Sequence, residues 1–323
     1  MKFARRSVLS AALAVPLAAR AEQFGGTYAP RPRQIADGVW VVRGADEAIA
    51  PGNGGAIANS TIIATDAGTV LVDPGPSLDY AKTLAAAALS ATGKPVTRVY
   101  VTHLHPDHAL GLGAFDPAIA FALPGTIEGL KQDGDGYADA MYRILAGWML
   151  GTQVVVPQGR VTPGPVEYGG RRLTAWAMAG HSRADLVLRD EPTGTLITGD
   201  LVFHDRAPAT PDADLAQWRA ALDALAVLPH RLLVPGHGPV EGSEAAIAQT
   251  RDWLEWLGSA LRTSVGAGLD MAEAGEQAIP GRFAAVKLAR YELQRSVSHF
   301  YPRLEAEMLP RIDAGSEAPR PKV

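Results

Sequence analysis

The chain is most constrained by one short run of potential metal ligands, which reads H-x-H-x-D-H. It follows Val96–Val101, whose period-2 pattern predicts a strand. Side chains two residues apart in an extended segment point to the same side, so the first two imidazoles can reach one ion. Pro106 then turns the chain and directs the last two ligands toward a second ion. The four candidate ligands are His103, His105, Asp107 and His108.

The ligand types indicate which ion is expected. Neutral imidazole and carboxylate suit zinc, with iron or manganese as alternatives. A polar surface loop is the competing interpretation, and a single histidine would favour it. Here five of the eight histidines belong to one ordered pattern, which His181 and His237 complete. We therefore predict a metal site.

The remaining candidate ligands each follow a predicted strand and stand beside a glycine. The strands are expected at Arg171–Ala177, Thr195–Thr198 and Arg231–Val234. Glycine beside a ligand lets the backbone approach closely, and rigid strands give a preorganised site. We expect each ligand where a strand gives way to a loop: His181 in A-G-H-S, Asp200 in T-G-D and His237 in P-G-H-G.

Composition excludes several classes of protein. The chain has 323 residues, of which 47% are hydrophobic and 20% charged, as in ordinary globular proteins. The sequence contains no cysteine, which excludes a thiolate metal ligand, an iron–sulfur cluster and a thiol nucleophile. Without the leader described next, 26 basic residues face 34 acidic ones, a net charge of −8. No basic run remains, so we expect no nucleic-acid partner.

The first 21 residues are typical of a secretory signal peptide. Basic residues precede an apolar run at Val8–Ala19, and Ala19-Arg20-Ala21 forms an A-x-A cleavage site. The apolar run is too short to span a bilayer. Arg5-Arg6 also resembles a twin-arginine signal, with the Sec route as the alternative. We expect a periplasmic protein without membrane insertion after cleavage, with one domain over 22–312 and a flexible tail at 313–323.

The order of the expected elements predicts an α/β fold. Strands precede helices in each half of the chain, which suggests a four-layer αββα sandwich with extra C-terminal helices. Further strands are expected at Val39–Arg43, Ala56–Ala64, Thr69–Val72 and Asp185–Arg189. Helices are expected at Leu78–Thr92, ended by Gly93, at Tyr137–Leu150 and Ala213–Leu228, and within Ser243–Leu261, Leu269–Ala278 and Arg282–Met308.

The ordered ligand set resembles that of the metallo-β-lactamase-fold hydrolases. This resemblance implies a dinuclear site, in which Asp200 bridges the two ions as in glyoxalase-II-type members. It also implies that Asp73, in V-D-P-G where the family has V-D-T-G, supports the metal loop from behind. By the same resemblance, His103, His105 and His181 hold the first ion, and Asp107, His108 and His237 hold the second.

A finer resemblance is to the SoxH-like branch, which includes the quinoprotein relay system zinc metallohydrolases. It rests on Gly147–Thr152, on Asp200–Phe203 with Trp218, and on Leu293–Val297. The branch is associated with PQQ-dependent periplasmic oxidation, which implies a quinoprotein dehydrogenase system as a partner. Core or pocket-wall packing is the competing interpretation of these tryptophans.

These features together predict an exported dinuclear zinc hydrolase. A hydroxide held between two Zn²⁺ ions would attack an ester, thioester, lactone or lactam, and Asp107 would move the proton. One alternative is a mononuclear iron enzyme like the persulfide dioxygenases, and another is a non-catalytic binding partner of a periplasmic quinoprotein. Candidates for a substrate-facing wall are Tyr137, Trp148, His204 and Arg206, with His204 and His230 equally explained as surface histidines.

Overall fold

The computed structural model describes residues 26–309. The predicted signal peptide (1–21) and the predicted flexible tail (313–323) lie outside the described residues.

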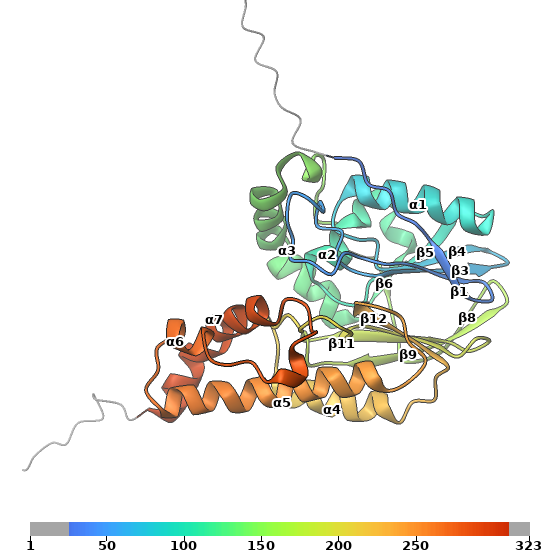
Figure 1. The fold of residues 1–323 in the computed structure, drawn as a ribbon. Coiled ribbons are helices and arrows are strands. Elements are labelled where there is room, and N and C mark those ends of the chain that lie inside the picture. Colours follow the sequence, from blue (N-terminus) through green and yellow to red (C-terminus); the bar gives the residue numbers. More distant parts are fainter. Residues whose placement is uncertain (1–25, 310–323) are drawn as a thin grey trace, which may run out of the picture.

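Two β-sheets form the centre of the structure (Figure 1). The first has seven strands in sequence order, antiparallel from β1 to β4 and parallel from β4 to β7. Its strands are β1 (Arg33–Ala36), β2 (Val39–Val42), β3 (Ser60–Thr65), β4 (Gly68–Val72), β5 (Val96–Tyr100), β6 (Ala120–Ala122) and β7 (Gly159–Arg160). The second sheet has the order β12-β11-β10-β9-β8, in which only β11 and β12 are parallel. Its strands are β8 (Gly164–Tyr168), β9 (Arg171–Met178), β10 (Asp185–Asp190), β11 (Thr195–Phe203) and β12 (Leu232–His237).

Helices cover the outer face of each sheet, and the last ones project to one side (Figure 1). The first sheet is covered by α1 (Leu78–Thr92), α2 (Pro106–Ala109) and α3 (Pro124–Leu145). The second is covered by α4 (Leu215–Ala226) and α5 (Ala245–Gly266), and α6 (Met271–Gly275) and α7 (Ala289–Met308) pack on the end of α5. Short 3₁₀ turns are Leu110–Ala114, Pro117–Ile119, Ala146–Met149 and Gly281–Phe283. The predicted αββα sandwich with extra C-terminal helices is confirmed.

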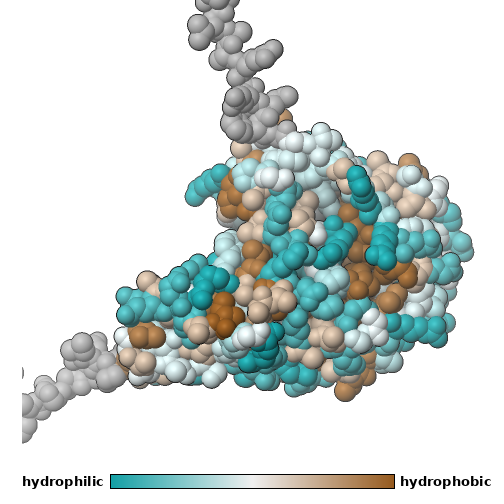
Figure 2. Space-filling view, viewed as in Figure 1, coloured by the Kyte–Doolittle hydropathy of each residue, from teal (hydrophilic) through white to brown (hydrophobic). Residues whose placement is uncertain are grey.

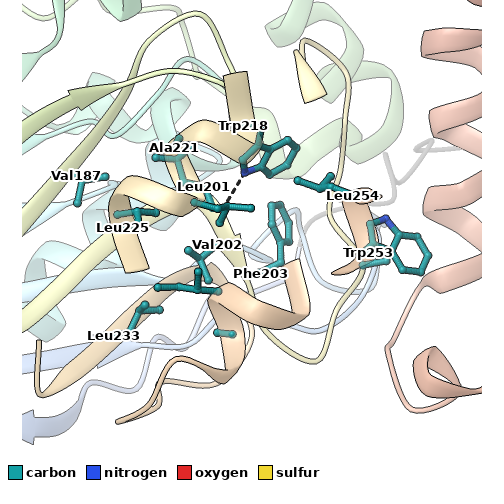
Figure 3. Close-up of a cluster of buried hydrophobic side chains, with 14 of the residues drawn as sticks. Val187, Leu201, Val202, Phe203, Trp218, Ala221, Leu225, Leu233, Trp253 and Leu254 are labelled. Atoms are coloured by element: carbon teal, nitrogen blue, oxygen red, sulfur yellow. Dashed lines mark hydrogen bonds between the residues drawn. The ribbon is translucent and has the colours of Figure 1, made fainter. Parts of the chain in front are cut away.

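Three apolar layers hold the sandwich together. Between the sheets, Ile63 and Val72 face Leu186 and Ile197. Outside the first sheet, Leu84 of α1 is fully buried. Outside the second sheet, the buried cluster centres on Trp218 and Trp253. Trp218 donates its indole N–H to the backbone carbonyl of Leu201 at 2.9 Å (Figure 3). This cluster includes Trp218, Phe203, Leu222, Trp253 and Leu254. Burial of these residues fixes β11 against α4 and α5.

The capping residues in the sequence predicted the bounds of α1 correctly. Ser77 caps its first turn by accepting a hydrogen bond from the Tyr80 N–H, and Gly93 ends it in the left-handed region at φ 72°. The helix therefore occupies Leu78–Thr92, as predicted.

The prediction for α3 was wrong at both ends. The helix begins at Pro124 rather than Tyr137, and residues 146–149 form a 3₁₀ turn rather than its last turn. Four glycines before Tyr137 lower the helix propensity of this part of the sequence, so the helix was not predicted there. Two of them allow close packing: a Cβ on Gly129 would lie 3.0 Å from Leu104, and one on Gly134 would lie 2.7 Å from Val154.

Other boundaries also differ from expectation. Strand β3 begins at Ser60 because residues before it form the loop that reaches β12. Strand β11 continues to Phe203, well beyond the expected end at Thr198. Helix α5 continues to Gly266, beyond the expected limit at Leu261, whereas α7 lies within its expected range. Over the described residues, no helix is both long and apolar enough to cross a membrane.

Two glycine-to-alanine changes should have opposite effects on stability. Gly93→Ala places a side chain in the left-handed region and should lower the free energy of unfolding by about 1 kcal/mol. Gly136→Ala, inside α3 with open space around it, should raise it by about 0.5 kcal/mol. Urea unfolding measures both, and changes of the same sign would contradict the assigned backbone conformations.

Candidate metal centre

The seven predicted ligands come together as two adjacent buried groups. His103 and His105 follow β5, while Asp107 and His108 lie in the short helix α2 that Pro106 begins. Within each group, the ligand atoms all lie within 4.8 Å of one another. One group is His103, His105, His181 and Asp200, and the other is Asp107, His108 and His237.

The expectation that these ligands sit where a strand gives way to a loop was wrong for Asp200, which lies inside β11. His237 is the last residue of β12, although that strand ends three residues later than expected. The register between these strands is irregular around Gly199, which turns the Asp200 side chain toward the histidines. Gly236 is required beside it, because a Cβ there would lie 1.9 Å from Asp200 Oδ1.

The Asp200 carboxylate is the point where the two groups meet. Its Oδ2 lies 3.3 Å from His181 Nε2 and 3.8 Å from His103 Nε2, both in the first group. The same Oδ2 lies 3.3 Å from His237 Nε2, and Oδ1 lies 3.0 Å from His108 Nε2, both in the second group. A single carboxylate thus contacts imidazoles of both groups, as a bridging ligand must.

Unpartnered polar atoms show that the residues fit a metal. Nε2 of His103, Nε2 of His108 and Oδ1 of Asp200 are buried and form no hydrogen bond of acceptable geometry within 26–309, although the last two atoms are 3.0 Å apart. Buried polar atoms without partners are costly, so such a cluster is explained by a cation that accepts their lone pairs. The donor set of imidazole nitrogen and carboxylate oxygen is one that suits zinc.

Electrostatics favour anionic carboxylates at this site. Burial tends to raise the pKa of Asp107 and of Asp200, but nearby histidines outweigh it and hold each pKa below its usual range. Burial lowers the pKa of His103 well below normal and that of His181 to about 3, so both rings are neutral ligands. At His108, Asp200 and the other carboxylates raise the pKa against the effect of burial, so cation binding displaces a proton there.

Asp73 supports the metal loop, as the sequence suggested. Its Oδ1 accepts the Thr102 N–H at 2.8 Å, and its Oδ2 accepts the Thr102 hydroxyl at 2.8 Å. The same Oδ2 lies 2.8 Å from His108 Nδ1. Since Thr102 also contacts His103 Nδ1 at 3.0 Å, one buried carboxylate orients ligands of both groups.

Sequence reasoning missed Asp212, which acts on the opposite side of the site. It lies in the loop between β11 and α4, and its Oδ2 is 2.9 Å from His105 Nε2. The Tyr137 hydroxyl of α3 donates to the same oxygen. The hydrogen bond from His105 lowers the pKa of Asp212 to about 2 against the effect of burial. Because Asp212 binds the Nε2 atom of His105, the Nδ1 atom of the same ring faces inward, 2.8 Å from His181 Nε2.

The structure does not bring together the four residues expected to form a substrate-facing wall. Tyr137 stands beside the site, with its ring 5.7 Å from that of His105. Trp148 instead packs on Tyr28 and donates to the backbone carbonyl of Pro51. Arg206 is buried and pairs with Glu292 at 3.6 Å, and the His204 ring contacts the Pro239 carbonyl.

A match to a family model decides the family. The model described as the metallo-beta-lactamase superfamily matches residues 53–237, more than half of the chain and all seven candidate ligands. The chain belongs to the metallo-beta-lactamase superfamily. The prediction of a hydrolase of this fold is thereby confirmed, and the superfamily together with the histidine and aspartate groups implies a divalent metal ion.

Individual relatives are distant. The acyl-coenzyme A thioesterase MBLAC2 of Bos taurus is 28% identical over 195 residues, which cover 55% of this chain and 69% of that protein. The beta-lactamase-like protein 2 homolog of Caenorhabditis elegans is 24% identical over 183 residues, 56% of each chain.

Solved structures share the fold of this superfamily member. A metallo-beta-lactamase from Pontibacter korlensis matches with a TM-score of 0.58 and 21% identity, over 70% of this chain and 99% of that one. The sec-alkylsulfatase Pisa1 from Pseudomonas sp. matches with a TM-score of 0.65 and 18% identity, over 85% of this chain and 50% of that one. At these identities, the likeness concerns the fold alone.

Removing the carboxylate behind His105 should weaken metal binding. Asp212→Ala frees the imidazole to rotate, so metal affinity should fall by ~10- to 100-fold. Tyr137→Phe should have a smaller effect in the same direction, because only the support of Asp212 is lost. Competition with a chromophoric chelator measures both variants.

The matched control is Asp133→Ala, which removes an exposed carboxylate of α3 that pairs with Arg183. It should leave metal affinity unchanged, since exposed ion pairs contribute little. Equal affinities in wild type and Asp212→Ala would show that Asp212 does not orient His105.

Proposed function

We propose that this protein is a dinuclear zinc hydrolase that cleaves a carbonyl compound of the ester, thioester, lactone or lactam type. The observation that carries the proposal is the position of Asp200, whose carboxylate contacts histidines of both ligand groups. Among the four classes, thioesters and esters are favoured by the similarity to an acyl-coenzyme A thioesterase.

Two ions are proposed because both ligand groups are complete. His103, His105 and His181 would hold the first ion, and Asp107, His108 and His237 would hold the second, with Asp200 shared. When bound, zinc supplies Lewis acidity, which activates water near neutral pH and polarises a carbonyl.

A side chain of the protein, Asp107, would transfer the proton during hydrolysis. Asp107 Oδ2 lies 3.3 Å from His237 Nε2, while Oδ1 makes no hydrogen bond within the described part of the chain. With a side chain that is 9% exposed, Asp107 is the most exposed of the seven candidate ligands. We infer that Asp107 Oδ1 takes the proton from the attacking water and passes it to the leaving group.

Two rival functions are separated by metal content. A mononuclear iron enzyme like the persulfide dioxygenases would leave the group of Asp107, His108 and His237 without a purpose, although all three are buried together. A non-catalytic binding partner would not need a complete, preorganised ligand set. Both features favour the dinuclear hydrolase.

Zinc-loaded protein should contain two zinc ions per chain and hydrolyse at least one acyl ester or thioester in a panel that also holds lactones and lactams. Elemental analysis and turnover are measured on the same sample. One iron per chain after expression with both metals supplied, together with no hydrolysis, would overturn the proposal.

Asp200→Asn tests the bridging role within this experiment. The amide keeps the size of the side chain but removes its charge, so turnover should fall by at least ~100-fold and metal content should drop. The control is Asp205→Asn on the same segment, where the side chain is 57% exposed and turnover should not change. Circular dichroism verifies the fold of both variants. Unchanged turnover with two ions bound in Asp200→Asn would exclude a bridging carboxylate.

We further propose that the protein is exported to the periplasm, with residues 1–21 as its signal peptide. Support comes from the sequence of the leader, which lies outside the described residues. The mature chain should begin at Glu22, which N-terminal sequencing of periplasmic protein measures. Replacing Arg5 and Arg6 by lysine should stop export through the twin-arginine route. Continued export of this variant would point to Sec, and an intact leader on periplasmic protein would reject cleavage.

Within the superfamily, we propose membership of the SoxH-like branch and a link to a periplasmic quinoprotein oxidation system. The proposal rests on the sequence motifs at Gly147–Thr152, Trp218 and Leu293–Val297. Trp218 is fully buried, and its ring centre is 4.9 Å from that of His181, so it also serves the core. Quinoprotein-dependent oxidation that is unaffected by deletion of this protein would contradict the link.

A further inference from the structure

Helix α7 contacts the loop that carries Asp212, although it lies beyond residue 237, where the family match ends. The Thr210 hydroxyl is 2.8 Å from Ser296 Oγ and 3.1 Å from His299 Nδ1, both of α7. Two residues after Thr210 comes Asp212, which contacts His105. The loop that carries Asp212, and so supports His105, is therefore hydrogen-bonded to α7.

His299 presents one free ring nitrogen beside this loop. Its side chain is half-buried, and Nε2 has no hydrogen-bond partner among residues 26–309. Burial lowers the pKa of His299, and the positive charge of Arg295 lowers it further, so the ring is neutral at pH 7. If Nδ1 accepts the Thr210 hydroxyl, which in turn accepts from Ser296, Nε2 carries the proton and is a donor.

On the same helix, one buried carboxylate faces two guanidinium groups. The buried Glu292 carboxylate is shared between two guanidinium groups, those of Arg206 at 3.6 Å and Arg295 at 3.3 Å. Within the described residues, neither arginine has another acidic partner within 4.0 Å. Arg295 lies four residues before His299, on the same side of the helix, and its side chain is 39% exposed.

The helix also faces the opposite wall of the site. The C-terminal helices project beside the edge of the sandwich that carries α2, with α3 on the other side (Figure 1). The molecular surface is indented between this projecting lobe and the α3 side (Figure 2). Tyr137 of α3 and His299 of α7 thus approach the Asp212 loop from two sides.

We propose that Arg295 and His299 form a recognition site for a carboxylate on the substrate, whose acyl carbonyl lies at the metal centre. This inference rests on the proposed hydrolase function and narrows its substrate to a carboxylate-bearing ester or thioester. A monoanion is matched because one positive charge is uncompensated. Guanidinium and imidazole N–H groups are suited to carboxylate oxygens. A purely structural role of α7 is the competing explanation, and it predicts no dependence on substrate charge.

Two thioesters, one anionic and one neutral, separate these explanations. The probes are S-acetyl-3-mercaptopropionate and its methyl ester, and release of the thiol by the zinc-loaded full chain is measured, so that cleavage of the methyl ester itself is not scored. Arg295→Gln should raise KM for the anionic probe about tenfold, the loss of one charged hydrogen bond, with kcat within about twofold. KM for the methyl ester should stay unchanged. His299→Asn should raise KM for the anionic probe by about fivefold, and Arg295→Lys should recover part of the loss.

The matched control is Arg303→Gln, which removes a guanidinium of α7 that pairs with Glu307 instead. It should alter neither KM. Equal effects of Arg295→Gln on both probes, or no effect on either, would overturn the inference even in an active enzyme. Circular dichroism verifies the fold, and Arg295→Lys replaces Arg295→Gln if the latter does not fold.

A binding measurement tests the recognition site independently of the hydrolase proposal. Ligand-observed NMR follows N-acetyl-β-alanine, the uncleavable amide analogue, on protein without added metal. Wild type should bind it, and Arg295→Gln should bind it about tenfold more weakly. If fully loaded protein hydrolyses neither these thioesters nor any compound in the panel, the hydrolase proposal fails and this measurement alone decides the recognition site. Equal binding by both proteins, or no binding by wild type, would overturn it.

Discussion

The contact on which the site depends is between one buried carboxylate and four imidazoles. Asp200 reaches histidines from the loop after β5, from α2, from the loop after β9 and from the end of β12. Burying a charge is costly unless it is paired, so segments far apart in the sequence must meet at this one side chain. The packing of β11 between two apolar layers holds the carboxylate at this point.

Around this contact, two more carboxylates fix the directions of the histidine rings. Asp73 belongs to the first half of the chain and orients His108 together with Thr102. Asp212 belongs to the second half and orients His105 with help from Tyr137 of α3. Both sheets therefore contribute to the support of the ligands as well as to the ligands themselves. A metal site whose rings are held from two sides keeps its geometry when substrate enters.

The sequence predicted those features that are determined by residues close together in the chain. The motif from His103 to His108 and the capped helix α1 carry their own local signals. The extent of β11 was hidden, because Thr198-Gly199-Asp200 resembles a turn and only pairing with β12 makes it a strand. Asp212 was missed because its partner His105 lies 107 residues away, and no local pattern marks such a contact. His299 was missed for the same reason, 89 residues from Thr210.

The placement of α7 separates two properties along the chain. All candidate metal ligands lie between His103 and His237, whereas the loop that carries Asp212 is hydrogen-bonded to a helix that starts at Ala289. Under the proposed recognition role, exposed side chains of this helix such as Arg295 would set substrate preference. Its buried contacts with the Asp212 loop would have to be kept, because that loop orients His105. Two rows of one helix would then evolve under different constraints, one free to follow the substrate and the other tied to the metal.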